Sequence, residues 1–106
     1  MTAQTPDQIP AITPADVQSK LDQGWSLVDV RRDDEWAAGH LEGAVHIPLD
    51  QLVDRVAEVP DKAVVYCHAG GRSARATGFL VSQGREAVNL DGGITEWTAE
   101  GHPVVS

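Results

Sequence analysis

Short apolar runs alternate with segments of helical periodicity along the whole chain, and this alternation restricts the possible folds more than any other feature. Strands that alternate with helices normally form a parallel sheet with helices packed on both of its faces. The sequence therefore predicts an α/β protein built on a mostly parallel sheet. The five expected strands are residues 9–12, 25–30, 45–47, 63–66 and 87–90.

Helical patterns fill the intervals between the predicted strands. Thr13 suits the capping position of the first helix, and Ser73 suits the cap of the helix that follows the fourth strand. Trp36 is expected to face the core from a short helix. His40 and His46 have no companions at metal-ligand spacing, so we expect both to be hydrogen-bonded structural residues. The helices after the first are expected over residues 33–38, 49–56, 74–81 and 94–99.

Length and charge define the broad class of protein. The 106 residues suffice for one hydrophobic core, so we expect a flexible segment over residues 1–8 and a single domain over 9–106. The net charge of −8 argues against binding to nucleic acid or to anionic membranes, because both require basic surfaces. The first residues do not resemble a signal peptide, and no apolar run approaches a membrane span. A free thiol is most stable in a reducing compartment, which makes the cytoplasm the expected location.

The only cysteine lies where the fourth predicted strand gives way to a helix. Open α/β sheets place their chemistry at the carboxyl ends of strands, and Cys67 stands at such an end. One cysteine excludes an intramolecular disulfide and a cysteine-cluster metal site, so the sequence predicts neither a metal nor another cofactor. The stretch reads Tyr66-Cys67-His68-Ala69-Gly70-Gly71-Arg72-Ser73.

The residues after Cys67 predict a loop that binds an anion. The N–H groups of a tight loop and the positive end of a helix dipole attract negative charge. Gly70 and Gly71 can adopt the positive φ angles of such a loop, and Arg72 adds a permanent charge with forked donors. These surroundings lower the pKa of a thiol from about 8.5 to roughly 3.5–7.5. A lone cysteine is often a small buried hydrophobe, but such a residue gains nothing from these neighbours, so we interpret Cys67 as reactive.

Two charged residues end the second predicted strand. Asp29 interrupts an apolar run, and a buried carboxylate requires a hydrogen-bond or ion-pair partner. We therefore expect it to hold N–H groups of the neighbouring loop. Arg31 has two possible roles. It reaches the same pocket as Arg72, creating a locally positive site for a small anion, or it forms a surface ion pair with Asp33, Asp34 or Glu35.

Taken together, these residues resemble the single-domain rhodanese family over nearly the whole chain. Each marker alone is weak, but five in the right order and spacing are highly specific. They are Leu27-Val28-Asp29-Val30-Arg31, Glu35-Trp36-Ala37-Ala38-Gly39-His40-Leu41-Glu42-Gly43-Ala44, Ile47-Pro48-Leu49, the stretch from Tyr66 to Ser73, and Asn89-Leu90-Asp91-Gly92-Gly93-Ile94 with Trp97.

The resemblance implies a three-layer α/β/α sandwich and transfer of sulfane sulfur through a persulfide on the cysteine. The donor it implies is a small sulfur-bearing anion, thiosulfate or a low-molecular-weight persulfide. The acceptor is cyanide, a thiol or a protein. The implied site consists of the sulfur acceptor Cys67, the cradle His68, Ala69, Gly70, Gly71, Arg72 and Ser73, and the supporting pair Asp29 and Arg31.

Two other functions are compatible with the loop. A phosphatase or arsenate reductase of the related cell-cycle phosphatase type has one more residue between cysteine and arginine. Here only four residues separate Cys67 from Arg72, and the shorter loop suits a single sulfur atom. A sulfur relay or interaction module would deliver the persulfide to a partner protein. His68 either contacts the donor or points into solvent.

Overall fold

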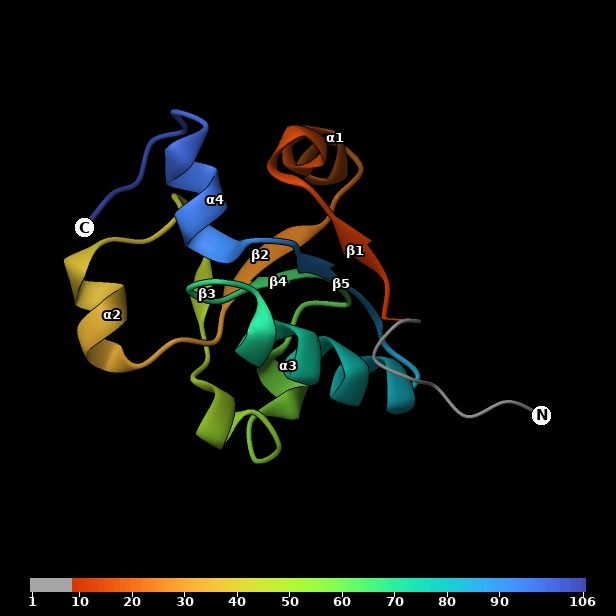
Figure 1. The fold of residues 1–106 in the computed structure, drawn as a ribbon. Helices are drawn as coiled ribbons and strands as arrows, with labels where there is room; N and C mark the ends of the chain where they lie inside the picture. The colour runs from red at the N-terminus through yellow and green to blue at the C-terminus, as the bar shows by residue number, and fades with distance from the viewer. Residues whose placement is uncertain (1–8) are drawn as a thin grey trace.

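Five strands form one sheet in the computed structural model, which describes residues 9–106 (Figure 1). The strand order is β1-β5-β4-β2-β3, and every pairing between neighbours is parallel. The predicted sheet is therefore confirmed, and the flexible segment expected over residues 1–8 lies outside the described residues. The strands are β1 (Ala11–Ile12), β2 (Ser26–Asp29), β3 (Val45–His46), β4 (Lys62–Tyr66) and β5 (Glu86–Leu90).

Residues 9–106 contain four α-helices, of which three connect strands and the fourth follows the last strand. A 3-10 turn, η2, precedes the first of them, so Thr13 caps a 3-10 turn and not an α-helix. No helix within residues 9–106 has the length and apolar character needed to span a bilayer. The helices are η2 (Pro14–Asp16), α1 (Val17–Asp22), α2 (Asp33–Ala38), α3 (Gly71–Ser82) and α4 (Gly93–Ala99).

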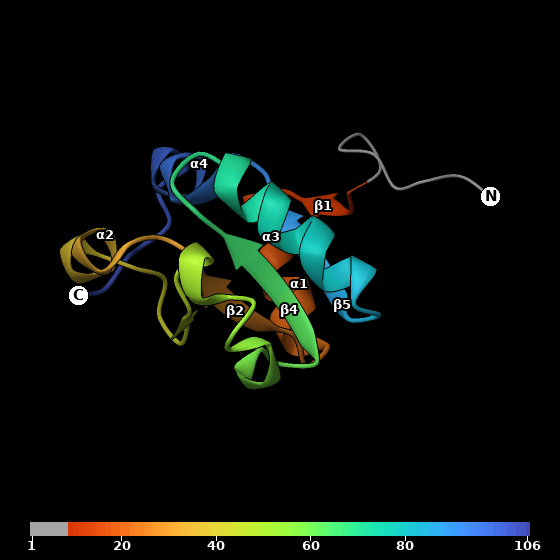
Figure 2. The same cartoon turned by 90° about the horizontal axis from the view of Figure 1, so that it is seen from below.

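The side chains of the central strand β4 alternate between two separate hydrophobic cores. Val65 packs with α3 residues on one face of the sheet, and Val64 packs with α1 and α4 residues on the other. Such alternation follows from the two-residue period of a strand. Figures 1 and 2 show the resulting layers, with α3 on one face and α1 and α4 on the opposite face. The three-layer α/β/α sandwich is confirmed.

The helix predicted over residues 49–56 is wrong. Two 3-10 turns, η3 (Leu49–Gln51) and η4 (Val56–Glu58), occupy this region. Only part of the apolar pattern is buried, since Leu52 is 2% exposed whereas Val53 is 66% exposed. The segment is confined between Pro48 and Pro60, and its β-branched valines are poor helix formers. These features leave too little buried surface to stabilise a continuous α-helix.

Trp36 does not enter the core, contrary to the prediction. Its indole is stacked between the rings of His40 and His46, with centroids 3.5 and 4.7 Å away. The reason is that α2 contributes no buried residue and lies beside the sheet rather than on it (Figure 1). His40 Nδ1 bonds the Trp36 carbonyl oxygen at 3.0 Å, and His46 Nε2 bonds that of Arg31 at 2.7 Å. The structural roles predicted for both histidines are confirmed.

The strand order brings three strand ends together. β4 lies at the centre of the sheet between β2 and β5, and Asp29 is in register with Tyr66 while Asn89 is in register with Val65. Since all three strands run the same way, the residues that follow them meet at one edge of the sheet. Asp29, Cys67 and Asn89 therefore belong to one neighbourhood, although they are far apart in the sequence.

Candidate active site

The loop after β4 is a tight turn with one left-handed residue. Gly70 has φ +107° and forms the N-cap of α3, which begins at Gly71. Gly71 does not have a positive φ, so only one of the two glycines serves the conformational role expected of both. The helix starts three residues earlier than predicted, and the prediction that Ser73 caps it is wrong. Ser73 instead lies inside the first turn of the helix, where it is buried.

Cys67 is held at the centre of this turn. Its residue is 1% exposed, and Sγ accepts hydrogen bonds from Gly70 N at 3.1 Å and from Ser73 Oγ at 3.3 Å. Burial alone would raise the pKa of the thiol, because it disfavours the charged form. Hydrogen bonds from Ser73 Oγ and from the N–H groups of Ser73, Gly70 and Ala69 outweigh burial and lower the pKa. The loop therefore stabilises a thiolate.

A Ser73→Ala variant is expected to raise the pKa of Cys67 and to slow its alkylation by iodoacetamide at about pH 6 roughly fivefold. The thiolate is the reactive form, and the variant loses a hydrogen bond to it, worth about 1 kcal/mol. The profile of alkylation rate against pH then shifts toward higher pH. Ser82→Ala is the control, because Ser82 lies on the same helix but bonds the Phe79 carbonyl oxygen. If the profiles of alkylation rate against pH were the same for wild type and Ser73→Ala, Ser73 would not stabilise the thiolate.

Asn89 is a site residue that the sequence reasoning missed. Its Oδ1 lies 2.5 Å from Ser73 Oγ, whose single proton is shared between this oxygen and Cys67 Sγ, and its Nδ2 donates to Gly70 O at 3.3 Å. Asn89 thus holds both the left-handed residue of the loop and the hydroxyl next to the thiol. It was identified only as part of a family marker. The available signal was an amide among the buried residues of strand β5, which are otherwise apolar, because a buried polar side chain needs a partner.

The start of α4 fastens the loop from the other side. Ile94 N donates to Cys67 O at 2.9 Å, and Thr95 N donates to His68 O at 3.0 Å. Gly93 makes this approach possible: a Cβ at this position would collide with the carbonyl oxygens of both loop residues. The loop is therefore held by backbone bonds from α4 and side-chain bonds from Asn89.

Asp29 and Arg31 form a buried ion pair next to the loop. Asp29 accepts hydrogen bonds from Arg31 N at 2.8 Å and from Arg31 Nη2 at 2.7 Å. Arg31 Nη2 also donates to Gly39 O at 2.6 Å. The expectation that Asp29 accepts hydrogen bonds from backbone N–H groups of the neighbouring loop is confirmed for the N–H group of Arg31. Neither of the two roles derived for Arg31 from the local sequence is observed, because its guanidinium is bound by Asp29, the residue with which the family resemblance pairs it.

Arg72 does not supply a free charge to the cradle, which corrects the prediction. Its Nη1 and Nη2 donate to the two carboxylate oxygens of Glu35 on α2, at 2.7 and 2.9 Å. This forked ion pair lowers the pKa of Glu35 to about 2. Arg31 and Arg72 are both matched by carboxylates, so the pockets that they line lack the excess positive charge that was expected. Local sequence could not reveal a partner 37 positions away.

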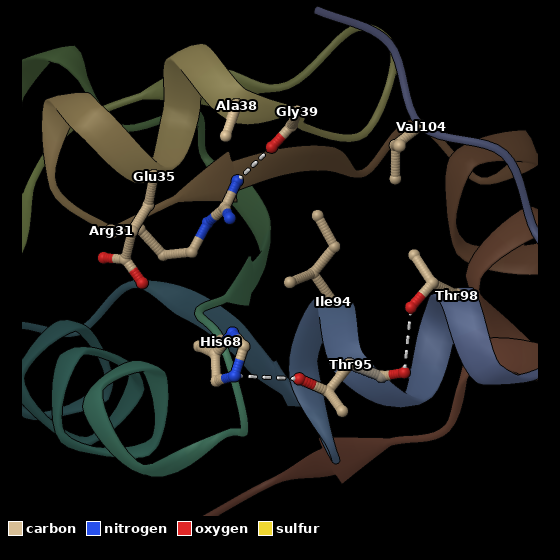
Figure 3. A pocket seen from close by; sticks show the side chains of 9 residues that line it. All are labelled: Arg31, Glu35, Ala38, Gly39, His68, Ile94, Thr95, Thr98 and Val104. Carbon is tan, nitrogen blue, oxygen red and sulfur yellow. Dashed lines mark hydrogen bonds between the residues drawn. The ribbon is translucent and has the colours of Figure 1, made fainter.

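A pocket of about 540 Å³ borders the loop at His68 (Figure 3). His68 is exposed and its Nε2 lies 3.3 Å from Thr95 Oγ1. Side chains from α2, the loop and α4 face this space, and most of them are apolar or present methyl groups. The lining residues are Arg31, Glu35, Ala38, Gly39, His68, Ile94, Thr95, Thr98 and Val104. Arg72 lines a neighbouring pocket with Arg32 and Asp50.

The chemistry available at this site depends on the thiol. Within residues 9–106, no three His, Cys, Asp or Glu side chains are placed to hold a metal ion. The fold and the site together define an α/β protein that presents a thiolate-stabilising loop at the carboxyl edge of its parallel sheet.

Comparison with known proteins identifies the family. Residues 13–100 match the Rhodanese-like domain family. The chain is 37% identical over 89 residues to the thiosulfate sulfurtransferase GlpE of Pseudomonas fluorescens, covering 81% of this chain and 82% of that protein. It also resembles the crystal structure of a rhodanese-related protein from Thermoplasma volcanium, with TM-score 0.84 and 33% identity, over 91% of this chain and 97% of the other. This chain belongs to the rhodanese family.

Some relatives are larger proteins. An HTH-type transcriptional regulator of Mycobacterium tuberculosis is 39% identical over 99 residues, which cover 89% of this chain but only 44% of the regulator. The family and the relative named as a sulfurtransferase support sulfurtransferase or sulfur-carrier activity.

Proposed function

We propose that the protein is a sulfurtransferase that carries sulfane sulfur as a persulfide on Cys67. The donor is thiosulfate or a low-molecular-weight persulfide, and the acceptor is cyanide or a thiol. The observation that carries this proposal is the pair of hydrogen bonds that Cys67 Sγ accepts from Gly70 N and Ser73 Oγ in a buried loop. Residues 9–106 act as a single domain, and the reactive thiol suits the reducing cytoplasm.

The two steps of this reaction need no metal and no strong general acid. The Cys67 thiolate attacks the outer sulfur of thiosulfate, the S–S bond breaks, and its electron pair leaves with sulfite. Cyanide then attacks the outer sulfur of the persulfide, leaves as thiocyanate and restores the thiolate. Both leaving groups are stable anions, so the loop contributes mainly by stabilising negative charge on sulfur.

The geometry argues against a phosphatase or arsenate reductase. Such reactions need a free arginine to clamp the oxygens of a tetrahedral anion. Arg72 has both terminal nitrogens bonded to Glu35, and four residues separate it from Cys67. Both observations favour a site that accepts one sulfur atom.

Intact-protein mass spectrometry tests the proposal directly. The reduced protein is incubated with sodium thiosulfate, desalted and weighed, and then weighed again after cyanide is added. We expect a gain of one sulfur atom on Cys67, which cyanide removes while thiocyanate appears. A protein that gains no sulfur from thiosulfate or from an organic persulfide would overturn the proposal. Hydrolysis of an aryl phosphate would then support the phosphatase alternative. Transfer to one specific protein, but not to small thiols, would make the chain a sulfur relay.

A further inference from the structure

The arginines that line the two pockets beside the Cys67 loop are all paired with carboxylates. The three arginines that line the two neighbouring pockets each pair with a carboxylate: Arg31 with Asp29, Arg32 with Asp34, and Arg72 with Glu35. Asp50 adds a further carboxylate to the second pocket. Three guanidinium groups therefore face four carboxylates, so the two pockets offer no net positive charge to a substrate.

This balance is unfavourable for a dianion. Thiosulfate carries two negative charges toward a thiolate, and repulsion between like charges a few ångströms apart amounts to several kcal/mol unless cations offset it. Arg72 is the nearest candidate, since its charge interacts with that of Cys67. Glu35 holds Arg72 by a forked pair in which the two side chains are 16% and 31% exposed, so solvent and salt screen the pair only in part.

The pocket at His68 supplies a second, independent observation. Its volume of about 540 Å³ lies within the range of roughly 300–1,000 Å³ that is usual for small-molecule sites, and thiosulfate has only five heavy atoms. Ala38, Ile94 and Val104 give it apolar walls (Figure 3). It adjoins the thiol loop through His68 and through Ile94, whose N–H bonds Cys67 O. The space suits an uncharged organic group attached to a transferable sulfur.

We propose that this site selects organic persulfides with an uncharged body over thiosulfate, and that Glu35 sets this preference by neutralising Arg72. The inference rests on the proposed sulfur transfer and specifies its donor class. The Cys67 thiolate attacks the outer sulfur of R–S–SH, the S–S bond breaks, and its electron pair leaves with the thiolate RS⁻. The outer sulfur, with its proton, remains on Cys67 as the persulfide. The group R occupies the pocket lined by Ala38 and Ile94.

The test compares two donors in matched variants. The rate constant for addition of one sulfur atom to Cys67 is measured by rapid quench and intact mass, with sodium thiosulfate and with the persulfide of 2-mercaptoethanol. Glu35→Gln leaves the charge of Arg72 uncompensated but keeps an oxygen that can accept from Arg32 N, as Glu35 does at 3.1 Å. We expect it to accelerate the thiosulfate reaction about tenfold, as one uncompensated charge nearby can, and to raise the ratio of the thiosulfate rate constant to the persulfide rate constant at least about threefold.

The control is Glu58→Gln, which breaks a similar forked pair with Arg55 in η4, a segment that precedes β4 and so lies away from the carboxyl edge of the sheet. It should change neither rate. The increase in the thiosulfate rate constant caused by Glu35→Gln should become smaller as the salt concentration is raised, because salt screens the charge of Arg72. Equal factors for both donors, or an unchanged thiosulfate rate in a folded Glu35→Gln protein, would overturn the assignment of Glu35.

A second pair of variants tests the pocket. Ala38→Trp fills it from the end of α2, whereas Ala37→Trp adds the same bulk at an exposed neighbour outside the lining. We expect Ala38→Trp to slow the organic persulfide about tenfold and thiosulfate less than twofold, and Ala37→Trp to affect neither. Equal slowing of both donors, or of neither, would overturn the pocket assignment. If the wild-type protein gains no sulfur from either donor, the proposed function itself fails. If it gains sulfur but the variants do not change the relative rates of the two donors, only the proposed donor preference fails.

Discussion

A Cys67→Ser variant is expected to lose sulfur transfer by at least about 1000-fold while the protein stays folded. Removal of a covalent nucleophile typically costs this much or more, and a serine hydroxyl is neither ionised near neutral pH nor able to form a persulfide. Serine is close to cysteine in size, and its oxygen can accept the hydrogen bond that Gly70 N now donates to Sγ. The fold should therefore tolerate the change even though Cys67 is buried.

The measurement is thiocyanate formation from thiosulfate and cyanide, together with the intact mass after exposure to the donor. Circular dichroism and a thermal melt verify that the variant is folded. Ser73→Ala is the useful comparison, because it weakens stabilisation of the thiolate but keeps the sulfur atom, so it should still gain one sulfur, only more slowly. Thiocyanate formation by Cys67→Ser above the enzyme-free rate would show that the nucleophile has been assigned wrongly.

The sequence predicted the parts of the structure that depend on local pattern. The alternation of apolar runs with helical segments predicted all five strands. The two-residue period of β4 sends its side chains to both faces of the sheet, and the apolar residues of α3 cover one of these faces. The position of Cys67 at the end of β4 followed from the same pattern. Left-handed Gly70 was predicted on the same local grounds, since a tight turn before a helix favours glycine.

The local sequence did not predict the ion pair of Arg72. Its guanidinium binds Glu35 on α2, whereas the pair of Asp29 and Arg31 was implied by the family resemblance. Each charge has several possible partners in a chain with sixteen acidic residues, and only the packing of α2 beside the loop decides among them. Asn89 was missed for the same reason, because its partners belong to a loop that reaches it only through the pairing of β4 with β5.

Gly93 is the position where a single methyl group should do the greatest structural damage. It has φ +58°, in the left-handed region. Its Cβ would meet Cys67 O and lie 2.5 Å from His68 O, two backbone atoms that α4 also binds through Ile94 N and Thr95 N. Backbone atoms cannot swing aside as the end of a side chain can. An alanine here must therefore either push the loop away from α4 or break these hydrogen bonds.

Gly84→Ala is the matched control for this argument. Gly84 also has a left-handed φ, +80°, but no atom lies within 4 Å of the Cβ that alanine would add. That variant should lose only the conformational preference of glycine, about 1 kcal/mol. The difference between the two variants then isolates the collision with the loop from the cost of the left-handed conformation.

Gly93→Ala is expected to lower the free energy of unfolding by about 3 kcal/mol, of which roughly 1 kcal/mol is the left-handed conformation and the rest is overpacking against the loop. For a chain of this size the melting temperature should fall by about 10–20 °C. Sulfur uptake by Cys67, measured at a temperature where the variant is still folded, should slow at least about tenfold, because the displaced loop carbonyls reorient the N–H groups that stabilise the thiolate. Urea denaturation and the quench measurement provide both values.

If Gly93→Ala and Gly84→Ala were equally stable, α4 would not fasten the loop as the contacts of Gly93 indicate. If the destabilised variant took up sulfur at the wild-type rate, the close packing of Gly93 against the loop would stabilise the fold without affecting the reactivity of Cys67.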